Sequence, residues 1–318
     1  MNIEEYIKYW DEVVRAWTNN DVQNEFYKKE RETILNNPVL TNFIHEDHMP
    51  EPYWGDPTKA SVIILNYNPG GGEDMNPQTY KKCLGCKNKE IGPTLINYVS
   101  KKNSSYHSAA RDFPLLNNDE KIDDDLKQIA TNYGGSKWWS NKKNWLTHLA
   151  EDAGKGKNLQ PFAMELCGWH SKRWPSVLLY KLKEEEDLWK HFEDTVIHPM
   201  LDAVRESNTF AVCIGKSIGN LLTRFGFKNT TPDLCKFIEL EYRRNKCDHI
   251  NINNGKKQAE ASDTNNKKGR NYRLLRSNNC YVINTWVNGS NKSPSIKYND
   301  IEKKIINYIN EFPLTTRE

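Results

Sequence analysis

Short apolar runs alternate along the chain with segments in which apolar residues recur at helical spacing. The apolar runs predict buried strands at 61–66, 161–167, 210–215 and 280–284. Helical spacing predicts helices at 3–35, 92–99, 186–206, 217–225 and 299–311. The stretch 251–271 is rich in Asn, Lys and Gly and predicts a flexible loop. Strands that alternate with helices form a parallel sheet covered on both faces, so the order predicts an α/β fold.

The first predicted strand leads directly into a glycine-rich polar turn. Its residues Val62 to Leu65 are apolar and mostly β-branched, which suits a strand buried on both faces. The turn at 66–72 contains Asn66 and Asn68 and ends in three consecutive glycines. Open α/β sheets place their ligand sites at the carboxyl ends of the strands, so this turn is the first candidate site. The alternative is that both asparagines only cap the turn.

Composition adds a reason to consider nucleic acids. The 318-residue chain can form one large domain or two small ones, and its net charge of +3 alone does not indicate nucleic-acid binding. It also has ten tryptophans and fifteen tyrosines, and aromatic rings beyond core needs often stack on bases. Cations and tryptophans are interleaved at 134–145, where Lys142 and Lys143 suit a surface that grips a DNA strand. The alternative is a helix that buries its tryptophans.

The expected compartment is the cytoplasm. The N-terminal residues lack the apolar core of a signal peptide, and no run is long enough to span a membrane. Seven cysteines, an odd number, then indicate a reducing compartment with mostly free thiols. Cys83 and Cys86 form a lone Cys-x-x-Cys motif, which Cys235, Cys247 and His249 could complete as a zinc site. Free thiols are the preferred interpretation, so we expect no metal and no cofactor.

The turn motif Asn66-Tyr67-Asn68-Pro69-Gly70 resembles the first active-site motif of the uracil-DNA glycosylase superfamily. It is most similar to the Gly-Ile-Asn-Pro-Gly form of the mismatch-specific uracil/thymine glycosylases. Glu165-Leu166-Cys167 resembles the strand end that reads the base, and 210–222 resembles a later strand-Gly-helix segment. The family's His-Pro-Ser run after the last strand is not intact. Its place is taken by Asn284-Thr285-Trp286 and then Ser290-Asn291-Lys292-Ser293-Pro294.

This resemblance covers residues 49–310 and implies a fold. The family fold is a three-layer α/β/α sandwich with a short, mostly parallel sheet. We therefore expect a single glycosylase-like domain over 1–318, with an N-terminal helical extension at 1–45 and insertions at 75–160 and 226–272. The resemblance also implies a monomer.

The resemblance further implies roles for the residues of the turn. Asn68 would position the water that attacks the sugar, with Asn66 beside it as a second catalytic residue. An amide does not titrate usefully, so Asn68 cannot be a strong general base. Tyr67, Gly70 and Gly71 would cradle the base, since glycine allows close backbone approach.

Glu165 bears on which base is recognised. The matching residue of the family is an Asn, which pairs with uracil through a donor and an acceptor. An ionised Glu offers only acceptors and would suit the exocyclic amine of cytosine. A protonated Glu could accept from N4 of cytosine and donate to N3. Both forms favour a cytosine-type base, whereas the alternative is a Glu that ion-pairs with Lys or Arg.

The segment after this strand is rich in cations and aromatic residues. His170 could donate to a base oxygen or to a phosphate, and the alternative is a solvated loop with a core tryptophan. We predict that the DNA contacts include Lys172, Arg173, Lys216, Ser290, Asn291 and Lys292, in addition to Lys142 and Lys143.

These features favour a monofunctional DNA glycosylase that flips out a modified pyrimidine and hydrolyses its N-glycosidic bond. By resemblance to anti-phage glycosylases, the expected substrate is glucosylated hydroxymethylcytosine in phage duplex DNA. Two alternatives stay open. One is a sensor of nucleotides or modified bases that binds without cutting, and the other is a uracil/thymine mismatch glycosylase.

Overall fold

A mixed sheet of seven strands, in the order β1-β3-β2-β4-β7-β6-β5, forms the centre of the computed structural model. β3, β2, β4 and β7 are parallel, while β1 at one edge and β6 and β5 at the other are antiparallel to their neighbours. The strands are β1 (Tyr53–Trp54), β2 (Val62–Asn66), β3 (Pro161–Glu165), β4 (Ala211–Ile214), β5 (Lys228–Asn229), β6 (Arg270–Arg276) and β7 (Tyr281–Val287). The predicted α/β class with a mostly parallel sheet is confirmed.

The description covers most of the chain but not all of it. The described residues are 1–44, 46, 48–66, 95, 98–99, 105–112, 122–132, 136–152, 160–171, 184–230, 270–278, 280–287, 300–312 and 314.

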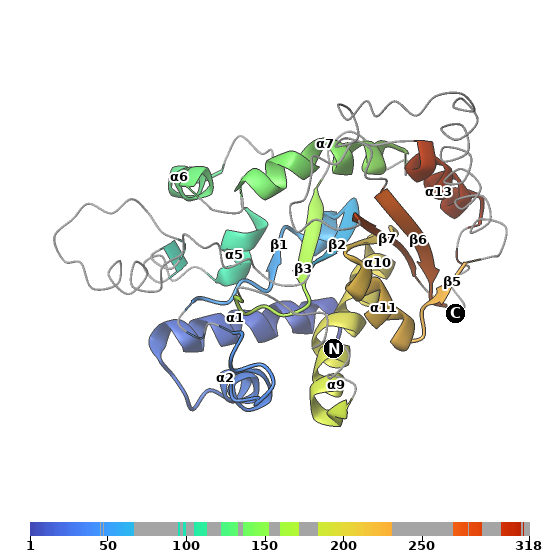
Figure 1. The fold of residues 1–318 in the computed structure, drawn as a ribbon. Helices are drawn as coiled ribbons and strands as arrows, with labels where there is room; N and C mark the ends of the chain where they lie inside the picture. The colour runs from blue at the N-terminus through green and yellow to red at the C-terminus, as the bar shows by residue number, and fades with distance from the viewer. Residues whose placement is uncertain are drawn as a thin grey trace, which may run out of the picture.

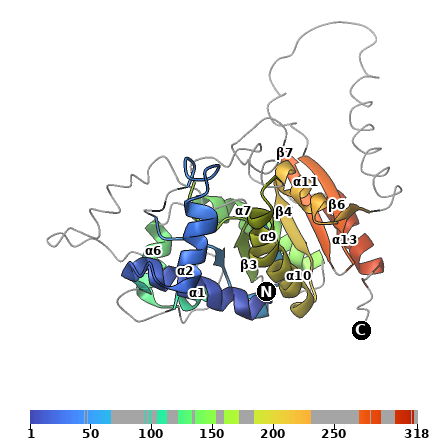
Figure 2. The same cartoon turned by 90° about the horizontal axis from the view of Figure 1, so that it is seen from below.

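Helices surround the sheet (Figure 1). α10 packs against β2, and α11 packs against β4, β6 and β7. β6 lies between α11 and α13 when the molecule is seen from the side and from below (Figures 1 and 2). The α-helices are α1 (Ile3–Asn19), α2 (Glu25–Glu30), α5 (Tyr106–Arg111), α6 (Asp124–Asn132), α7 (Ser136–Asp152), α9 (Glu186–Phe192), α10 (His198–Glu206), α11 (Lys216–Arg224) and α13 (Asp300–Glu311). The other helical segments are η1 (Arg31–Leu35), η2 (Pro57–Lys59) and η4 (Glu193–Ile197).

The central strand β2 is buried along its whole length. Val62, Ile63, Ile64 and Leu65 are each 0% exposed. β2 has strands on both sides and helices near its faces, so a polar side chain in the strand would be buried without a hydrogen-bond partner. For this reason the run of apolar residues predicts the strand reliably. The polar residue that follows the run marks the end of the strand.

The N-terminal segment is not the single helix predicted at 3–35. α1 ends at Asn19, and Asn20 takes a left-handed conformation with φ 54°. Asn24 then starts α2 by accepting hydrogen bonds from the backbone N–H groups of Phe26 and Tyr27. Asparagine tolerates the left-handed region and caps helices well, so these residues account for the break.

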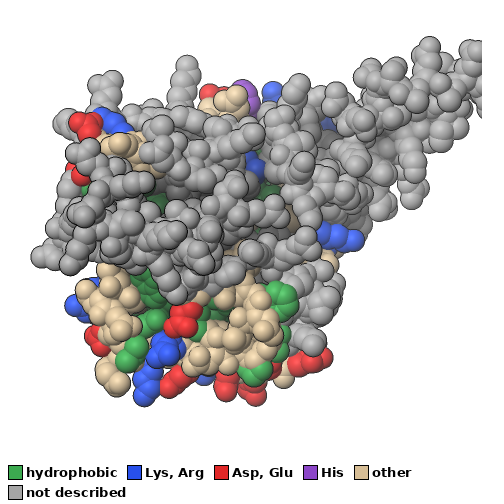
Figure 3. Space-filling view, turned by 60° about the vertical axis from the view of Figure 1, so that its left-hand side comes forward, with side chains coloured by type: hydrophobic (Ala, Val, Ile, Leu, Met, Phe, Trp, Pro, Cys, Tyr) green, Lys and Arg blue, Asp and Glu red, His purple; other side chains and the backbone are tan. Residues whose placement is uncertain are grey.

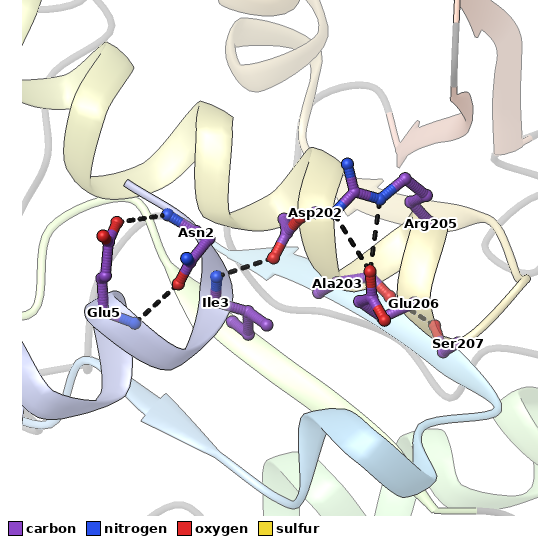
Figure 4. Close-up of polar contacts among 8 residues, drawn as sticks. All are labelled: Asn2, Ile3, Glu5, Asp202, Ala203, Arg205, Glu206 and Ser207. Carbon is purple, nitrogen blue, oxygen red and sulfur yellow. Dashed lines mark hydrogen bonds and ion pairs between the residues drawn. The ribbon is translucent and has the colours of Figure 1, made fainter. Parts of the chain in front are cut away.

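The first turn of α1 is fastened to α10 (Figure 4). Asn2 and Glu5 form a reciprocal capping box, with hydrogen bonds of 2.8 and 2.9 Å. The backbone N–H of Ile3 donates to Asp202 Oδ2 at 2.8 Å. A carboxylate at a helix N-terminus complements the helix dipole, so Asp202 stabilises α1 where it meets the rest of the molecule.

One π-helical turn lies inside a longer helix, and another ends one. The helix predicted at 186–206 is present as α9, η4 and α10 in direct succession, with the π-helical turn at Glu193–Ile197. The second π-helical turn, Arg31–Leu35, follows α2 and contacts α9. Such turns often occur at functional sites, and apolar spacing alone does not predict them.

Strand β6, which lies between β7 and the edge strand β5, was missed because its pattern is ambiguous. Arginines occupy every third position of the strand, at 270, 273 and 276, and its first residues fall within the predicted flexible loop 251–271. Pairing with β7 from Arg270 to Arg276 makes it a strand, with Tyr272, Leu274 and Leu275 buried. Both ends of the proposed insertion 226–272 therefore lie in the sheet.

The described helices include none that is both long and apolar enough to cross a membrane.

Candidate functional site

The carboxyl ends of the parallel strands β3, β2, β4 and β7 lie at the same edge of the sheet. The chain passes from β2 to β3 on one side and later from β4 to β7 on the other side. The strand order therefore reverses next to β2, and open α/β sheets bind ligands at such a switch point. In the sheet register Asn66 lies opposite Glu165, and Leu65 lies opposite Cys213. The prediction that Asn66 ends its strand is confirmed.

Asn66 and Glu165 are in direct contact at this edge. Asn66 Nδ2 donates to Glu165 Oε1 at 3.2 Å, and the residues are 8% and 7% exposed. The backbone holds both in place, since Leu166 N–H donates to the Asn66 carbonyl and Glu165 N–H donates to the Pro52 carbonyl, each at 2.9 Å. Among the described residues, the side chain that hydrogen-bonds to Glu165 is thus an amide, rather than the Lys or Arg of the alternative interpretation.

The environment of Glu165 favours its protonated form. Burial raises the pKa of this carboxyl well above its usual value, and the nearby Glu51 carboxyl raises the pKa further. The hydrogen bond from Asn66 lowers the pKa; this effect is smaller than that of burial but larger than that of Glu51. Within the described part of the chain, Glu165 Oε2 has no hydrogen-bond partner. A neutral carboxyl with one committed oxygen can still donate one hydrogen bond through the other oxygen.

The raised pKa predicts how stability depends on pH. The folded protein holds the Glu165 proton more tightly than the unfolded chain does, so this stabilisation is complete below the unfolded pKa, near 4.5. It is lost as the pH rises from there towards the folded pKa, by at most about 1.4 kcal/mol per pH unit. Glu165→Gln cannot titrate, so denaturant unfolding from about pH 4.5 to about pH 7.5 should show wild type losing stability relative to this variant. A constant difference in unfolding free energy between the two proteins would contradict a neutral Glu165.

A buried carboxylate–histidine pair lies next to Glu165. His170 Nε2 is 3.3 Å from Glu51 Oε1, and both side chains are 3% exposed. The His48 ring lies tilted against the His170 ring, with centroids 5.3 Å apart. His170 Nδ1 is buried without a hydrogen-bond partner among the residues described. The described part of this segment, Trp169 to Ser171, is buried and therefore is not a solvated loop, while Trp169, at 0% exposed, is the core tryptophan that the alternative expected.

The loop that carries His170 is clamped from several directions. Glu51 N–H donates to the Gly168 carbonyl at 2.8 Å, and Ser171 forms a bridge with Ile44. A Cβ on Gly168 would lie 2.8 Å from the Trp10 ring and 2.9 Å from Pro52 Cβ, so only glycine fits here. Sequence reasoning did not single out Glu51, although its position between two prolines before a strand marks a rigid segment.

Glu30 forms a second buried polar cluster behind this loop, which sequence reasoning also missed. Its carboxylate accepts from Tyr9 Oη at 2.6 Å and from Trp169 Nε1 at 2.8 Å, and His191 Nε2 lies 3.1 Å away. Burial alone would raise the pKa of this carboxyl. The charge and hydrogen bond of His191, together with the other two donors, outweigh burial and lower the pKa below its usual value. The ionised carboxylate thus ties Trp169, the neighbour of His170, to the N-terminal helices.

The other side of the switch point is formed by the start of α11. Lys216, the first residue of this helix, is exposed, and Gly215 before it has φ 129°. Asn284 Nδ2 donates to the carbonyls of Gly215 at 2.9 Å and Cys213 at 3.3 Å, and Asn284 Oδ1 accepts from Arg273 at 3.1 Å. Asn284 belongs to the segment that stands in place of the His-Pro-Ser run. Its hydrogen bonds hold the turn at Gly215, which precedes Lys216.

The remaining predicted site residues divide into two groups. Lys142 is 1% exposed within α7, so it is not a surface cation that could grip a strand directly. The side chain of Lys143 lies outside the described residues, as do Tyr67, Asn68, Gly70, Gly71, Lys172, Arg173, Ser290, Asn291 and Lys292. On the face seen in Figure 3, the basic and acidic side chains of described residues are intermixed.

Three cysteines lie among the described residues. Cys167, Cys213 and Cys280 are free and buried, and burial raises the pKa of each thiol, so they are poor nucleophiles. Cys83, Cys86, Cys235 and Cys247 lie outside the described residues. The described histidines, cysteines and carboxylates include no group of three or more arranged to hold a metal ion.

No family model, curated protein or solved structure matches this chain.

Proposed function

We propose that this protein is a monofunctional DNA glycosylase that excises a modified cytosine and leaves an abasic site. The observation that carries the proposal is the buried Glu165 carboxyl at the switch point, held by Asn66 and in an environment that favours its protonated form. A neutral carboxyl in that position has the donor and acceptor pattern that complements a cytosine-type base.

The hydrogen bond from Asn66 determines which oxygen plays which part. Because Asn66 Nδ2 donates to Glu165 Oε1, the proton belongs on Oε2. Oε1 retains a second lone pair for the N4 amine of cytosine, while Oε2–H can donate to N3. Uracil would place O4 against an acceptor and N3–H against a donor. Unpaired buried polar groups of this kind discriminate strongly between otherwise similar substrates.

The same proton supports the departure of the base. Breaking the N-glycosidic bond moves an electron pair onto the base, and a donor aimed at that developing charge lowers the barrier. A proton passed from Oε2 to N3 would let the base leave as a neutral molecule. This role substitutes for the leaving-group histidine that the altered His-Pro-Ser segment lacks.

The resemblance to the uracil-DNA glycosylase superfamily supplies the rest of the proposal. It assigns the positioning of the attacking water to Asn68, and it completes the fold as a three-layer α/β/α sandwich. It also suggests a bulky glucosylated hydroxymethyl group on the base and phage duplex DNA as the substrate. Exposed Lys216 at the switch point, with Lys172 and Arg173 after β3, would bind the phosphates.

Incubation with defined DNA duplexes tests the proposal. We expect abasic sites, detected by alkaline strand cleavage, in DNA containing glucosylated hydroxymethylcytosine and none in matched DNA containing uracil. Tight binding to modified DNA without abasic sites would instead establish the sensor alternative. Abasic sites in uracil DNA alone would establish a uracil glycosylase and overturn the reading of Glu165.

A further inference from the structure

The side chains of Glu51 and His170 form a buried pair that has no part in the proposed recognition of the base. The carboxylate faces one ring nitrogen, Nε2, at 3.3 Å, which leaves Nδ1 as the other functional nitrogen. Nδ1 is buried and has no hydrogen-bond partner in the part of the chain that is described. A buried ring nitrogen normally has a partner, and a water or a substrate group is the partner that we expect for Nδ1.

Both chain segments that carry the pair, one with Glu51 and one with His170, lie close to Glu165. Pro52, the neighbour of Glu51, accepts the hydrogen bond of the Glu165 backbone N–H at 2.9 Å. His170 follows Glu165 in the short clamped loop, where Glu51 N–H holds Gly168 at 2.8 Å. The Glu51 carboxyl also lies near enough to Glu165 to raise the pKa of that carboxyl.

We infer that His170 is the general base of the hydrolytic step, with Glu51 as the residue that positions it. The inference rests on the proposed glycosylase function. It provides what the turn motif lacks, because the Asn68 amide can orient a water but cannot accept its proton. A carboxylate that holds one nitrogen of an imidazole leaves the lone pair of the other nitrogen free to accept a proton, and it stabilises the imidazolium that forms.

The protons and electron pairs of the step balance. The water oxygen forms a bond to C1′ of the sugar, and the C1′–N1 electron pair leaves with the base. One water proton passes to His170 Nδ1, and the Glu165 proton passes to N3 of the base. The products are an abasic sugar, a neutral base, an imidazolium and a carboxylate. Transfer of the proton from His170 to Glu165 restores the starting state.

Other titratable side chains lie around His170. Among the described residues, Glu51 and His48 are titratable groups that face it, and Glu165 lies near Glu51. Protonation of His170 would remove the base, so the rate should fall on the acid side of the pH profile. This fall in rate at low pH is the acid limb of the profile. A histidine with only a structural role would change the fraction of folded protein, but it would not produce an acid limb in the rate of the folded enzyme.

The test uses single-turnover excision from modified DNA between about pH 5 and about pH 9, together with the Kd for the same DNA. His170→Gln should lower the rate at neutral pH by about 100-fold or more, with Kd changed by less than about threefold, and should lack the acid limb. Glu51→Gln should lower the rate at least about tenfold and retain the limb. His198→Gln is the matched control, since His198 forms a more exposed pair with Asp194 at 3.5 Å and should behave as wild type.

The possible failures are distinguishable. A folded His170→Gln enzyme that keeps its rate within about threefold and keeps the acid limb would overturn the inference while leaving the glycosylase intact. If His170→Gln does not fold, the excision rate of Glu51→Gln is the test of the inference. An unchanged rate in Glu51→Gln would overturn it. Absence of abasic sites with wild-type protein on any modified DNA would remove the proposed function, and the inference with it.

Discussion

Replacing Glu165 with alanine should reduce the single-turnover rate of base excision by at least about 100-fold, because both the base-reading hydrogen bonds and the proton for the leaving base are lost. Glu165→Gln separates these two contributions. The amide keeps an acceptor at Oε1, oriented by the 3.2 Å hydrogen bond from Asn66, and places an N–H donor where the Oε2 proton was. It cannot give up that proton. We therefore expect Glu165→Gln to bind modified DNA within a few-fold of wild type and to excise the base about 100-fold more slowly.

The measurements are the excision rate and the Kd for modified and uracil duplexes. Met164→Leu is the control, because Met164 is buried in the same strand and this swap conserves volume. The control should keep both the rate and the base preference. If Glu165→Gln excised the base at the wild-type rate, proton donation by Glu165 would be excluded. If Glu165→Ala kept the preference for cytosine over uracil, the base-reading role would be excluded as well.

Removal of the Glu30 carboxylate should cause the largest loss of stability among single substitutions near the site. Glu30→Ala would leave Tyr9, Trp169 and His191 without their shared acceptor in a region where Glu30 itself is 1% exposed. Breaking a buried ionic cluster by deleting one member typically costs about 3–5 kcal/mol. Denaturant unfolding followed by tryptophan fluorescence should show this loss as a lower midpoint with an unchanged slope.

Two further variants make this prediction specific. Glu30→Gln keeps an acceptor but removes the charge, so we expect an intermediate loss of about 1–3 kcal/mol. Glu32→Ala is the matched control in the adjoining π-helical turn, because Glu32 is exposed and its ion pair with Lys28 spans 3.9 Å. A surface pair contributes at most about 1 kcal/mol, so this variant should unfold close to wild type. Equal losses for Glu30→Ala and Glu32→Ala would show that the buried cluster does not stabilise the protein.

Sequence patterns predicted the parallel core of the sheet but not its edges. The apolar runs of β2, β3, β4 and β7 reflect burial on both faces, a strong local signal. β1 has only two residues, and β6 combines buried apolar residues with arginines at every third position. β1 is buried but too short to carry a pattern, and the pattern of β6 is ambiguous, so tertiary pairing rather than local pattern determines where these two strands form.

The candidate site was located only in part by the sequence. Asn66 and Glu165 were recognised because each follows an apolar run, and chain topology brings strand ends to one edge of a sheet. Glu51 and Glu30 were missed, since a glutamate in a loop or helix normally indicates solvent exposure. Only the packing around them shows that both are buried and paired with histidines.

The sequence by itself determined the α/β class, the four parallel strands and the presence of polar residues at two strand ends, because these follow from hydrophobic patterns within a few residues. Only the tertiary structure decided what those polar residues do. Asn66 and Glu165 are 99 positions apart, yet they share a hydrogen bond, and Trp169 reaches Glu30 across 139 positions. Whether a carboxyl is neutral, as favoured at Glu165, or ionised, as favoured at Glu30, depends on burial and on partners from distant segments, and no local pattern encodes either of these.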